Sequence, residues 1–265
     1  MEDGYFVALP FAGVMDGVSE PYYKNRPQVK FRDERLTGGE VISRITEGFF
    51  IQQSIGKDAL DLDLRDLVLG ANKLVKEEFE AHGFSLDRPE RLAGATFAIA
   101  KMGEIKVELV QAGDCFALWV TTGGEIGITP NQVRQHDTEY NDLIEKIQRR
   151  IAKEKYNLEL EKVISSQSRE IREEMWLEFN SIWEKGRARD VNNPSSPSGY
   201  GLLNGQAKLK EMLFHKIIQR DNLNTLLLFT DGIVPWETMK DKNDIEIART
   251  VYATYEKGGL PELLP

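Results

Sequence analysis

Asp16 has the position that most suggests chemistry, because it follows the apolar run 11–15 and precedes Gly17. Glycine has no side chain to block close approach, so the Asp16 carboxylate and the Gly17 carbonyl can face one point. Such oxygens suit a hard cation like Mg²⁺ or Mn²⁺, which takes few carboxylates and keeps several waters. Asp-Gly is also a frequent turn dipeptide, so a plain turn is the competing interpretation.

Other acidic residues also stand next to a glycine beside an apolar run. They are Glu2 and Asp3 before Gly4, Asp114 after Gly113, and Asp231 before Gly232. Carboxylates at separate strand ends can converge where the ends of a sheet meet, and cations then offset their repulsion. Two such ions can support hydrolysis. The pattern therefore predicts a divalent-cation site with hydrolytic chemistry.

Other catalytic arrangements are not visible in the sequence. It contains no Gly-x-Ser-x-Gly elbow, no Gly-x4-Gly-Lys phosphate loop and no His-Glu-x-x-His motif. The single cysteine, Cys115, excludes an internal disulfide, and its neighbour Asp114 would raise the thiol pKa and disfavour a nucleophilic thiolate. His82, His136 and His215 lack the spacing of a metal-binding helix face, so structural or surface roles are expected.

Composition places the chain among acidic globular proteins. The 265 residues are 41% hydrophobic and 29% charged, with a formal net charge of -9. Nucleic-acid binding needs basic surface, so this balance argues against it and suits cation binding. No apolar run is long enough to cross a membrane, and the acidic start lacks the basic region of a secretory signal. With a lone cysteine, a cytoplasmic location without a membrane partner is expected.

Amphipathic helices and short strands are expected to position these carboxylates. Helical spacing of apolar residues covers 41–50, after a capping box from Thr37 to Glu40, and continues over 64–79, with a last helix at 244–257. Strands are expected at 5–9, 11–15, 94–102, 105–112, 115–121, 125–129, 200–203, 211–218 and 225–230. The segment 94–129 predicts an antiparallel meander with helices on one face. The continuous apolar run 226–229 predicts a central strand covered on both faces.

Long, charge-dense helical sequence occupies 137–190. Two apolar stripes, one with Ile144 and Ile151 and one with Trp176 and Trp183, predict two helices packed as a hairpin onto the main body. The stripe with both tryptophans is alternatively a partner surface. The segment 192–198 (NNPSSPS) has the composition of a linker.

In chain order, the motifs resemble those of the PPM-type, or protein phosphatase 2C, family of metal-dependent serine/threonine phosphatases. The motifs are Glu-Asp at 2–3, VMDGV at 14–18, GATF at 94–97, GDC at 113–115 and LFTDG at 228–232. The resemblance implies one domain over 1–265 with a helical insertion at about 137–197. It also implies an α+β fold, a four-layer αββα sandwich of two antiparallel sheets flanked by helix pairs, with a two-metal cleft at one end.

The same resemblance implies roles for individual residues. Asp16 matches the catalytic carboxylate that bridges both ions, the Gly17 carbonyl matches a ligand of one ion, and Asp231 matches a ligand of the other. The implied reaction is attack of a water shared by two Mg²⁺ or Mn²⁺ ions on a phosphoserine or phosphothreonine of a protein substrate. No covalent enzyme intermediate is required.

Three further acidic residues are implied to lie in the metal site. Glu2 matches a carboxylate that acts largely through water, and Asp3 lies beside it. Asp114 matches a residue that, with the Asp231 equivalent, holds a looser third ion.

The sequence departs from the family pattern in three places. No arginine precedes Glu2, Val18 stands where eukaryotic members carry a proposed proton-donating histidine, and the expected final strand with its Asp-Asn step is missing. The pair Asp221-Asn222 imitates that step but is expected to form the turn before the strand at 225–230. Two hypotheses remain: a phosphatase, weak in this form, or a catalytically impaired relative that binds a partner or phosphoprotein through the same fold.

Overall fold

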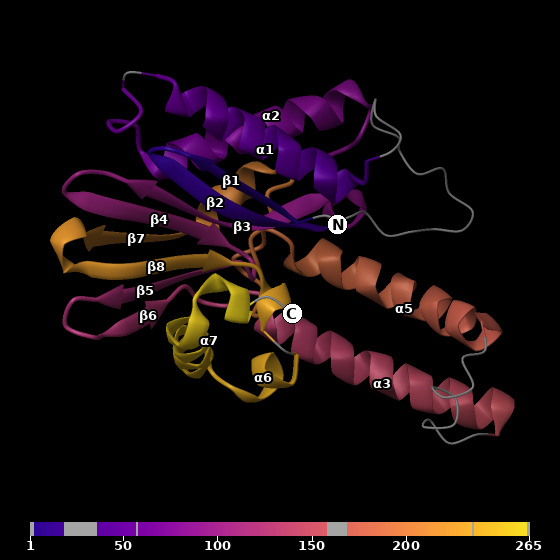
Figure 1. The fold of residues 1–265 in the computed structure, drawn as a ribbon. Helices are drawn as coiled ribbons and strands as arrows, with labels where there is room; N and C mark the ends of the chain where they lie inside the picture. Colours follow the sequence, from indigo (N-terminus) through magenta and orange to yellow (C-terminus); the bar gives the residue numbers. More distant parts are fainter. Residues whose placement is uncertain (1–2, 19–35, 57, 158–168, 235, 264–265) are drawn as a thin grey trace.

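The computed structural model describes residues 3–18, 36–56, 58–157, 169–234 and 236–263. Two antiparallel sheets, one of five strands and one of three, pack face to face with helices on their outer sides (Figure 1). The helices α1 (Gly38–Ser54) and α2 (Leu64–Ala81) cover the larger sheet, and α7 (Asp244–Gly258) covers the smaller one beside the short α6 (Trp236–Asp241). The predicted α+β sandwich is confirmed.

The larger sheet has the strand order β1-β2-β3-β4-β7 and the smaller one the order β6-β5-β8. The larger sheet contains β1 (Gly4–Ala8), β2 (Phe11–Val18), β3 (Gly94–Met102), β4 (Lys106–Ala112) and β7 (Phe214–Gln219). The smaller sheet contains β5 (Phe116–Thr121), β6 (Ile126–Ile128) and β8 (Leu223–Phe229). All neighbouring strands run antiparallel, as predicted.

The expected meander over 94–129 is wrong, because β3 and β4 belong to one sheet while β5 and β6 belong to the other. The chain changes sheets at Gly113, whose φ of 84° lies in the left-handed region that glycine tolerates. Hydrogen bonds hold the turn on both sides: Gly113 donates its N–H to Gln132 Oε1 at 3.0 Å and accepts from Gln111 Nε2 at 2.7 Å. Asp114 therefore lies at the junction between the sheets.

β8 lies at the edge of the smaller sheet, so its expected place as a central strand is wrong. Leu227 and Phe229 pack against the α7 side, whereas Leu226 and Leu228 pack into the core between the sheets. Both faces of the strand are thus apolar, as expected. The apolar run indicates that both faces of the strand are buried. It does not indicate whether both edges of the strand pair with other strands.

Side chains of β2 alternate between the two faces of the larger sheet. Phe11 and Met15 are buried in the core beneath α1 and α2, where Phe50 of α1 stacks on Phe6 of β1 at 5.1 Å. Since successive side chains of a strand point to opposite faces, Asp16 points toward the smaller sheet. The sheet pairing thus directs this carboxylate into the interior of the sandwich.

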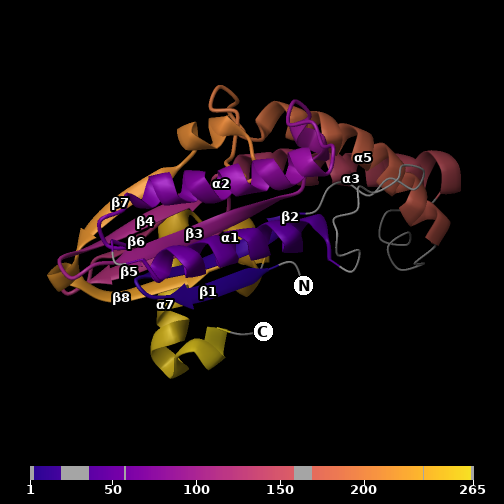
Figure 2. The ribbon, with the colours of Figure 1, turned by 90° about the horizontal axis from the view of Figure 1, so that it is seen from above.

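The charge-dense segment forms two helices, α3 (Arg134–Tyr156) and α5 (Arg169–Asp190), which lie side by side and project beyond the sheet ends (Figures 1 and 2). The Tyr140 hydroxyl donates to the Ile182 carbonyl at 3.2 Å, and Arg189 pairs with Glu139 at 2.9 Å. The expected pairing of the two helices is confirmed, but they project beyond the sheets, so the expected packing of the hairpin onto the main body is wrong. No helix formed by the described residues is both long and apolar enough to cross a membrane.

The segment 192–198 is not a linker, because its ends are buried and hydrogen-bonded. Asn192 exchanges side-chain hydrogen bonds with both backbone groups of Leu202, at 2.8 and 2.9 Å. Ser198 donates to Glu139 at 2.7 Å. Next to it, 200–203 makes only isolated bridges rather than the expected strand.

Smaller differences concern ends and exposure. The strand expected at 211–218 begins only at Phe214, after a 3₁₀ turn at Ala207–Glu211. Leu74 and Ile245 belong to the apolar spacing that predicts the helices at 64–79 and 244–257, yet they are 38% and 39% exposed. Asp221-Asn222 forms part of the turn before β8, as expected.

The start of α1 packs directly on the backbone beside Asp16. The predicted capping box is present, with Thr37 Oγ1 accepting from Glu40 N at 3.2 Å and Glu40 Oε2 accepting from Thr37 N at 2.8 Å. A Cβ atom on Gly39 would lie 2.8 to 2.9 Å from backbone atoms of Gly17. The missing side chain at Gly39 therefore allows the helix to reach β2 at this level.

We expect Gly39→Ala to lower the free energy of unfolding by about 1–3 kcal/mol, because the added methyl must push α1 away from β2. Urea denaturation would measure this loss. Gly48→Ala is the matched control, since Gly48 lies in the same helix and its Cβ would meet nothing within 4 Å. It should instead raise the free energy by about 0.5–1 kcal/mol. Equal effects of the two substitutions would contradict the packing argument.

Candidate functional site

Asp16 lies inside β2 and not in a turn. It faces Thr96 of β3 in the antiparallel register, Gly17 faces Ala95, and the strand continues to Val18. The competing turn interpretation from the sequence is therefore wrong. A side chain within a paired strand is held more firmly than one on a turn, and its direction is fixed by the sheet.

The sandwich brings Asp114 and Asp231 to the same end as Asp16. Asp114 lies two residues before the start of β5, and Asp231 lies two residues after the end of β8. Phe116 and Phe229 are partners in the antiparallel β5–β8 pair, so these two ends adjoin. Thr96, opposite Asp16 on β3, donates a hydrogen bond to Asp114 Oδ1 at 2.7 Å and so links the larger sheet to this junction.

The carboxylates repel one another at this end of the sandwich. The pKa of Asp16 is raised to about 8, first by burial and then by the charges of Asp114 and Asp231. The pKa of Asp231 is raised to about 6, first by burial and then by Asp114 and Asp3. Burial also raises the pKa of Asp114, against the hydrogen bond from Thr96. Burial and neighbouring like charges both disfavour the ionised carboxylate, and burial is the larger cause at each of these residues.

Asp3 approaches the same group from β1. Its side chain is within hydrogen-bonding reach of Asp16, and Thr230 Oγ1 donates to Asp3 Oδ2 at 3.5 Å. Glu2, the remaining predicted metal ligand, lies outside the described residues.

A pocket beside these carboxylates contains residues that the sequence did not single out. It is lined by Asp114, Asn131, Arg134, Asp137, Thr138, Asp231 and Met239. The pKa of Asp137 is raised to about 7 by burial and then by Asp114 and Asp231. Asp137 is thus a further carboxylate of the site. Its only signal in the sequence is its place in the first turn of a helix, where acidic residues are common anyway.

Arg134 contributes positive charge to the pocket wall. Its guanidinium donates to the Met239 carbonyl at 2.9 Å and also contacts the Lys242 carbonyl and the Asp244 carboxylate. These contacts fasten the first turn of α3 to α6 and the start of α7. Arg134 is thus a fixed positive charge in the lining of this pocket.

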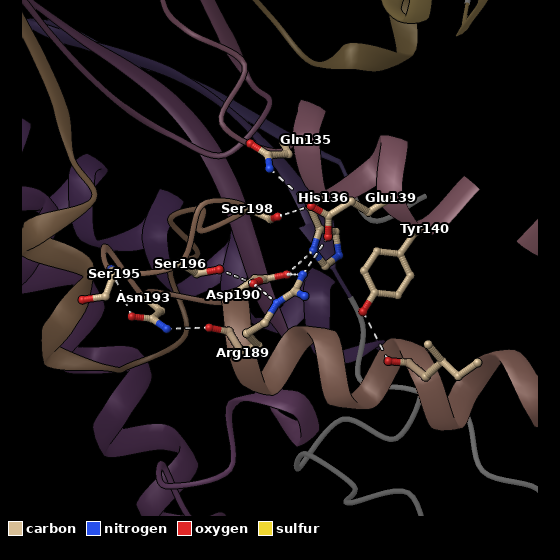
Figure 3. A network of polar contacts seen from close by, with 11 residues as sticks. Gln135, His136, Glu139, Tyr140, Arg189, Asp190, Asn193, Ser195, Ser196 and Ser198 are labelled. Atoms are coloured by element: carbon tan, nitrogen blue, oxygen red, sulfur yellow. Dashed lines mark hydrogen bonds and ion pairs between the residues drawn. The ribbon is translucent and has the colours of Figure 1, made fainter. Parts of the chain in front are cut away.

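A polar network holds the root of the helical hairpin next to the pocket (Figure 3). His136 Nδ1 lies 2.9 Å from Asp190 Oδ2. Asp190 also accepts hydrogen bonds from Arg189 at 2.6 and 2.7 Å and from Ser196 at 2.6 Å. Burial lowers the pKa of His136, so the neutral ring donates to the carboxylate. His136 thus has the expected structural role, and it fixes the helical turn that carries Asp137.

Cys115 is buried at the same junction. Burial, and then the Asp114 charge, raise the pKa of its thiol well above the ordinary value. A buried protonated thiol is a poor nucleophile, which agrees with the expectation that Cys115 is not catalytic.

The donor types of the site suit hard cations. Carboxylate oxygens and the Gly17 carbonyl are ligands that Mg²⁺ and Mn²⁺ accept. Within the described ranges, however, no three His, Cys, Asp or Glu side chains stand close enough together to hold a metal ion. The charges of these carboxylates interact, but the described side chains do not surround a site for an ion.

A scan against protein-family models finds no match for this sequence, and a search of curated proteins finds none either. Solved structures do show similarity. One is PstP/Ppp from Mycobacterium tuberculosis, with 14% identity, a TM-score of 0.48, and coverage of 99% of this chain and 80% of that chain. A second is Stp1 from Staphylococcus aureus, with 14% identity, a TM-score of 0.45, and coverage of 93% and 79%. Those proteins are serine/threonine phosphatases.

A further similar structure is the catalytic domain of PstP in complex with two manganese ions, with 14% identity, a TM-score of 0.48, and coverage of 95% of this chain and 77% of that chain. The proteins found are of the class that the motif order resembles. With TM-scores below 0.5 the likeness supports no conclusion about activity, which depends on the residues of this chain.

Without metal, we expect Asp16→Asn to stabilise the protein at pH 8. The pKa of Asp16 rises from 3.8 to about 8 on folding, so the folded state binds more protons between these values. The stability from this group is present at low pH and is lost as the pH rises toward 8. Asparagine removes the loss, which we put at about 1–2 kcal/mol after solvent screening.

Urea denaturation in a chelator between pH 5 and 8 would measure this effect. The asparagine variant should show a flatter pH dependence than the wild type. Asp221→Asn is the matched control, because Asp221 is exposed in the turn before β8. A variant at Asp16 that is less stable than the wild type at pH 8 would contradict the proposed repulsion.

Proposed function

We propose that this protein is a Mg²⁺- or Mn²⁺-dependent phosphatase that hydrolyses phosphoserine or phosphothreonine in protein substrates. The observation that carries the proposal is the convergence of Asp16, Asp114 and Asp231 from separate strand ends. The charges of Asp114 and Asp231 add to the effect of burial on the pKa of Asp16, and the charge of Asp114 does so on the pKa of Asp231. The motif order in the sequence supports the same reaction class. Mutual repulsion of this kind is offset when divalent cations bind.

Asp16, Asp114 and Asp231, together with the Gly17 carbonyl, would hold the cations, and Asp3 lies beside them. Bound cations would neutralise the phosphoryl oxygens and lower the pKa of a coordinated water. The backbone orients these carboxylates. The pairing of β2 fixes the direction of Asp16, and the Gly113 turn fixes the position of Asp114. No side chain in the described site is needed as a covalent nucleophile, in keeping with the buried and protonated Cys115.

The pocket gives this site a wall on the side of α3. Arg134, already held by three acceptors, places positive charge near the acidic group, where it favours a phosphoryl substrate. The helical hairpin starts from the same wall, so a protein substrate that reaches the pocket would pass beside it. This arrangement supports a role of the hairpin in substrate choice.

A binding module without catalysis is the second candidate. It is favoured by the finding that the described carboxylates do not form a group able to hold a metal ion. In that case the fold would recognise a phosphoprotein or partner without hydrolysis. The two candidates differ in their dependence on manganese.

Wild-type protein supplied with Mn²⁺ is expected to release phosphate from a phosphothreonine peptide, and Asp16→Asn should reduce the rate by about 100-fold or more. Phosphate release measured with and without a chelator would test this. Asp221→Asn should leave the rate unchanged, because that residue is exposed in the turn before β8, at the opposite end of the strand from Asp231. Equal rates for wild type and Asp16→Asn, or none from folded protein with Mn²⁺, would support the binding module instead.

Asp137→Asn should raise the Mn²⁺ concentration needed for half-maximal activity by about three- to tenfold. Asp137 faces the charges of Asp114 and Asp231 and so adds to the potential that attracts cations. The rate at saturating Mn²⁺ should change by less than about threefold. Asp142→Asn, which removes the same charge from an exposed position of α3, is the control. A similar shift in both variants would assign the effect to the general charge of the helix.

A further inference from the structure

Thr96 lies where the two sheets meet at the acidic site. It is 2% exposed, near the start of β3. In the antiparallel register its Cα faces that of Asp16 on β2. Side chains of directly opposed residues lie on the same face of a sheet, about 4.5–5.5 Å apart at Cβ. The Thr96 side chain is therefore a neighbour of Asp16 on the side that faces the smaller sheet.

The Thr96 hydroxyl contacts two residues at the junction between the sheets, Asp114 and Cys115. It donates to Asp114 Oδ1 at 2.7 Å and lies 3.3 Å from Cys115 Sγ. A hydroxyl carries only one hydrogen. Since that hydrogen goes to Asp114, the contact with Cys115 must have the thiol as donor. The three side chains form a directed chain from Cys115 through Thr96 to Asp114.

The turn that carries Asp114 is shaped around Thr96. A Cβ atom on Gly113 would lie 2.2 Å from Thr96 Cγ2 and 2.4 Å from Thr96 Cβ. Gly113 thus rests against the methyl side of the threonine, while the hydroxyl reaches the next residue. The threonine supplies two separable contacts, one of packing and one of hydrogen bonding.

We propose that Thr96 is a positioning residue for the acidic site: its hydroxyl holds one oxygen of Asp114 and leaves the other for the pocket that Asp114 lines. The inference rests on the proposed function, because it concerns the cations that Asp114 would bind. A buried hydroxyl–carboxylate hydrogen bond fixes the direction of the acceptor, and such outer contacts commonly change metal affinity by about 10–100-fold.

The test separates packing from hydrogen bonding at Thr96. Thr96→Val keeps the methyl against Gly113 and removes the donor, whereas Thr96→Ser keeps the donor and removes the methyl. Calorimetric titration of metal-free protein with Mn²⁺ is the main measurement, and phosphate release is the second. We expect Thr96→Val to weaken Mn²⁺ binding about tenfold and Thr96→Ser to stay within about threefold of the wild type.

Thr46→Val is the matched control for the loss of a buried hydroxyl. Thr46 is fully buried in α1, and its hydroxyl donates to the Ile42 carbonyl at 2.9 Å, with no acidic side chain involved. It should bind Mn²⁺ as the wild type does. Circular dichroism checks that each variant is folded, and Thr96→Ala, which adds no bulk, replaces Thr96→Val if that variant does not fold.

Combination with Asp114→Asn shows whether Thr96 acts through Asp114. In that background Thr96→Val should cause no further loss of Mn²⁺ affinity. Wild-type affinity in Thr96→Val, while Asp114→Asn weakens binding, would overturn the positioning role and leave the proposed function standing. Wild-type affinity in both Asp16→Asn and Asp114→Asn would overturn the proposed function and this inference with it.

Discussion

The main constraint on this structure is that it has to hold like charges together at one end of a sandwich. Asp16, Asp114 and Asp231 are each partly buried, and each has a pKa raised first by that burial. Such a cluster opposes folding unless a cation or a proton neutralises it. The apolar cores on either side of the larger sheet and beneath α7 therefore have to stabilise the fold independently of the site.

Each of these carboxylates is held by a different device. The sheet pairing of β2 directs Asp16, the left-handed Gly113 turn and the Thr96 hydroxyl direct Asp114, and the end of β8 directs Asp231. The devices meet because β5 and β8 are antiparallel partners whose ends adjoin. A shift of one residue in the register of β2 would send the Asp16 side chain to the opposite face of the sheet. The antiparallel registers thus determine the site as well as the core.

Much of the fold follows from local sequence patterns. The capping box at Thr37, the helical spacing over 64–79 and the alternation in β2 depend on residues near one another in the chain, so the sequence predicts them. Assignment of strands to two sheets does not, since it depends on the backbone conformation at Gly113. The edge position of β8 was hidden because both of its faces are apolar. Segment 192–198 has a linker composition, yet its hydrogen bonds to Leu202 and Glu139 come from tertiary contacts.

The candidate site was predictable to a similar degree. The Asp-Gly pairs mark Asp16 and Asp231, and the Gly-Asp pair marks Asp114. The glycine allows close packing at Gly113, against Thr96, and at Gly17, where the start of α1 approaches. Asp137 has no such mark. It reaches the pocket only because α3 begins beside α6 and α7, where Arg134 holds it. A residue that reaches the site because its helix packs against distant segments has no local sequence pattern that predicts its role.

Among the residues that the structure describes, the root of the helical hairpin connects it to the acidic site. Arg134 ties the first turn of α3 to Met239 and Asp244, while His136 joins it to Asp190 at the end of α5. Farther along, the two helices contact each other and project away from the sheets. Changes in the outer part of the hairpin can therefore alter what it touches without moving Asp137. Changes at the root would displace the pocket wall, so the root couples the hairpin to the proposed chemistry.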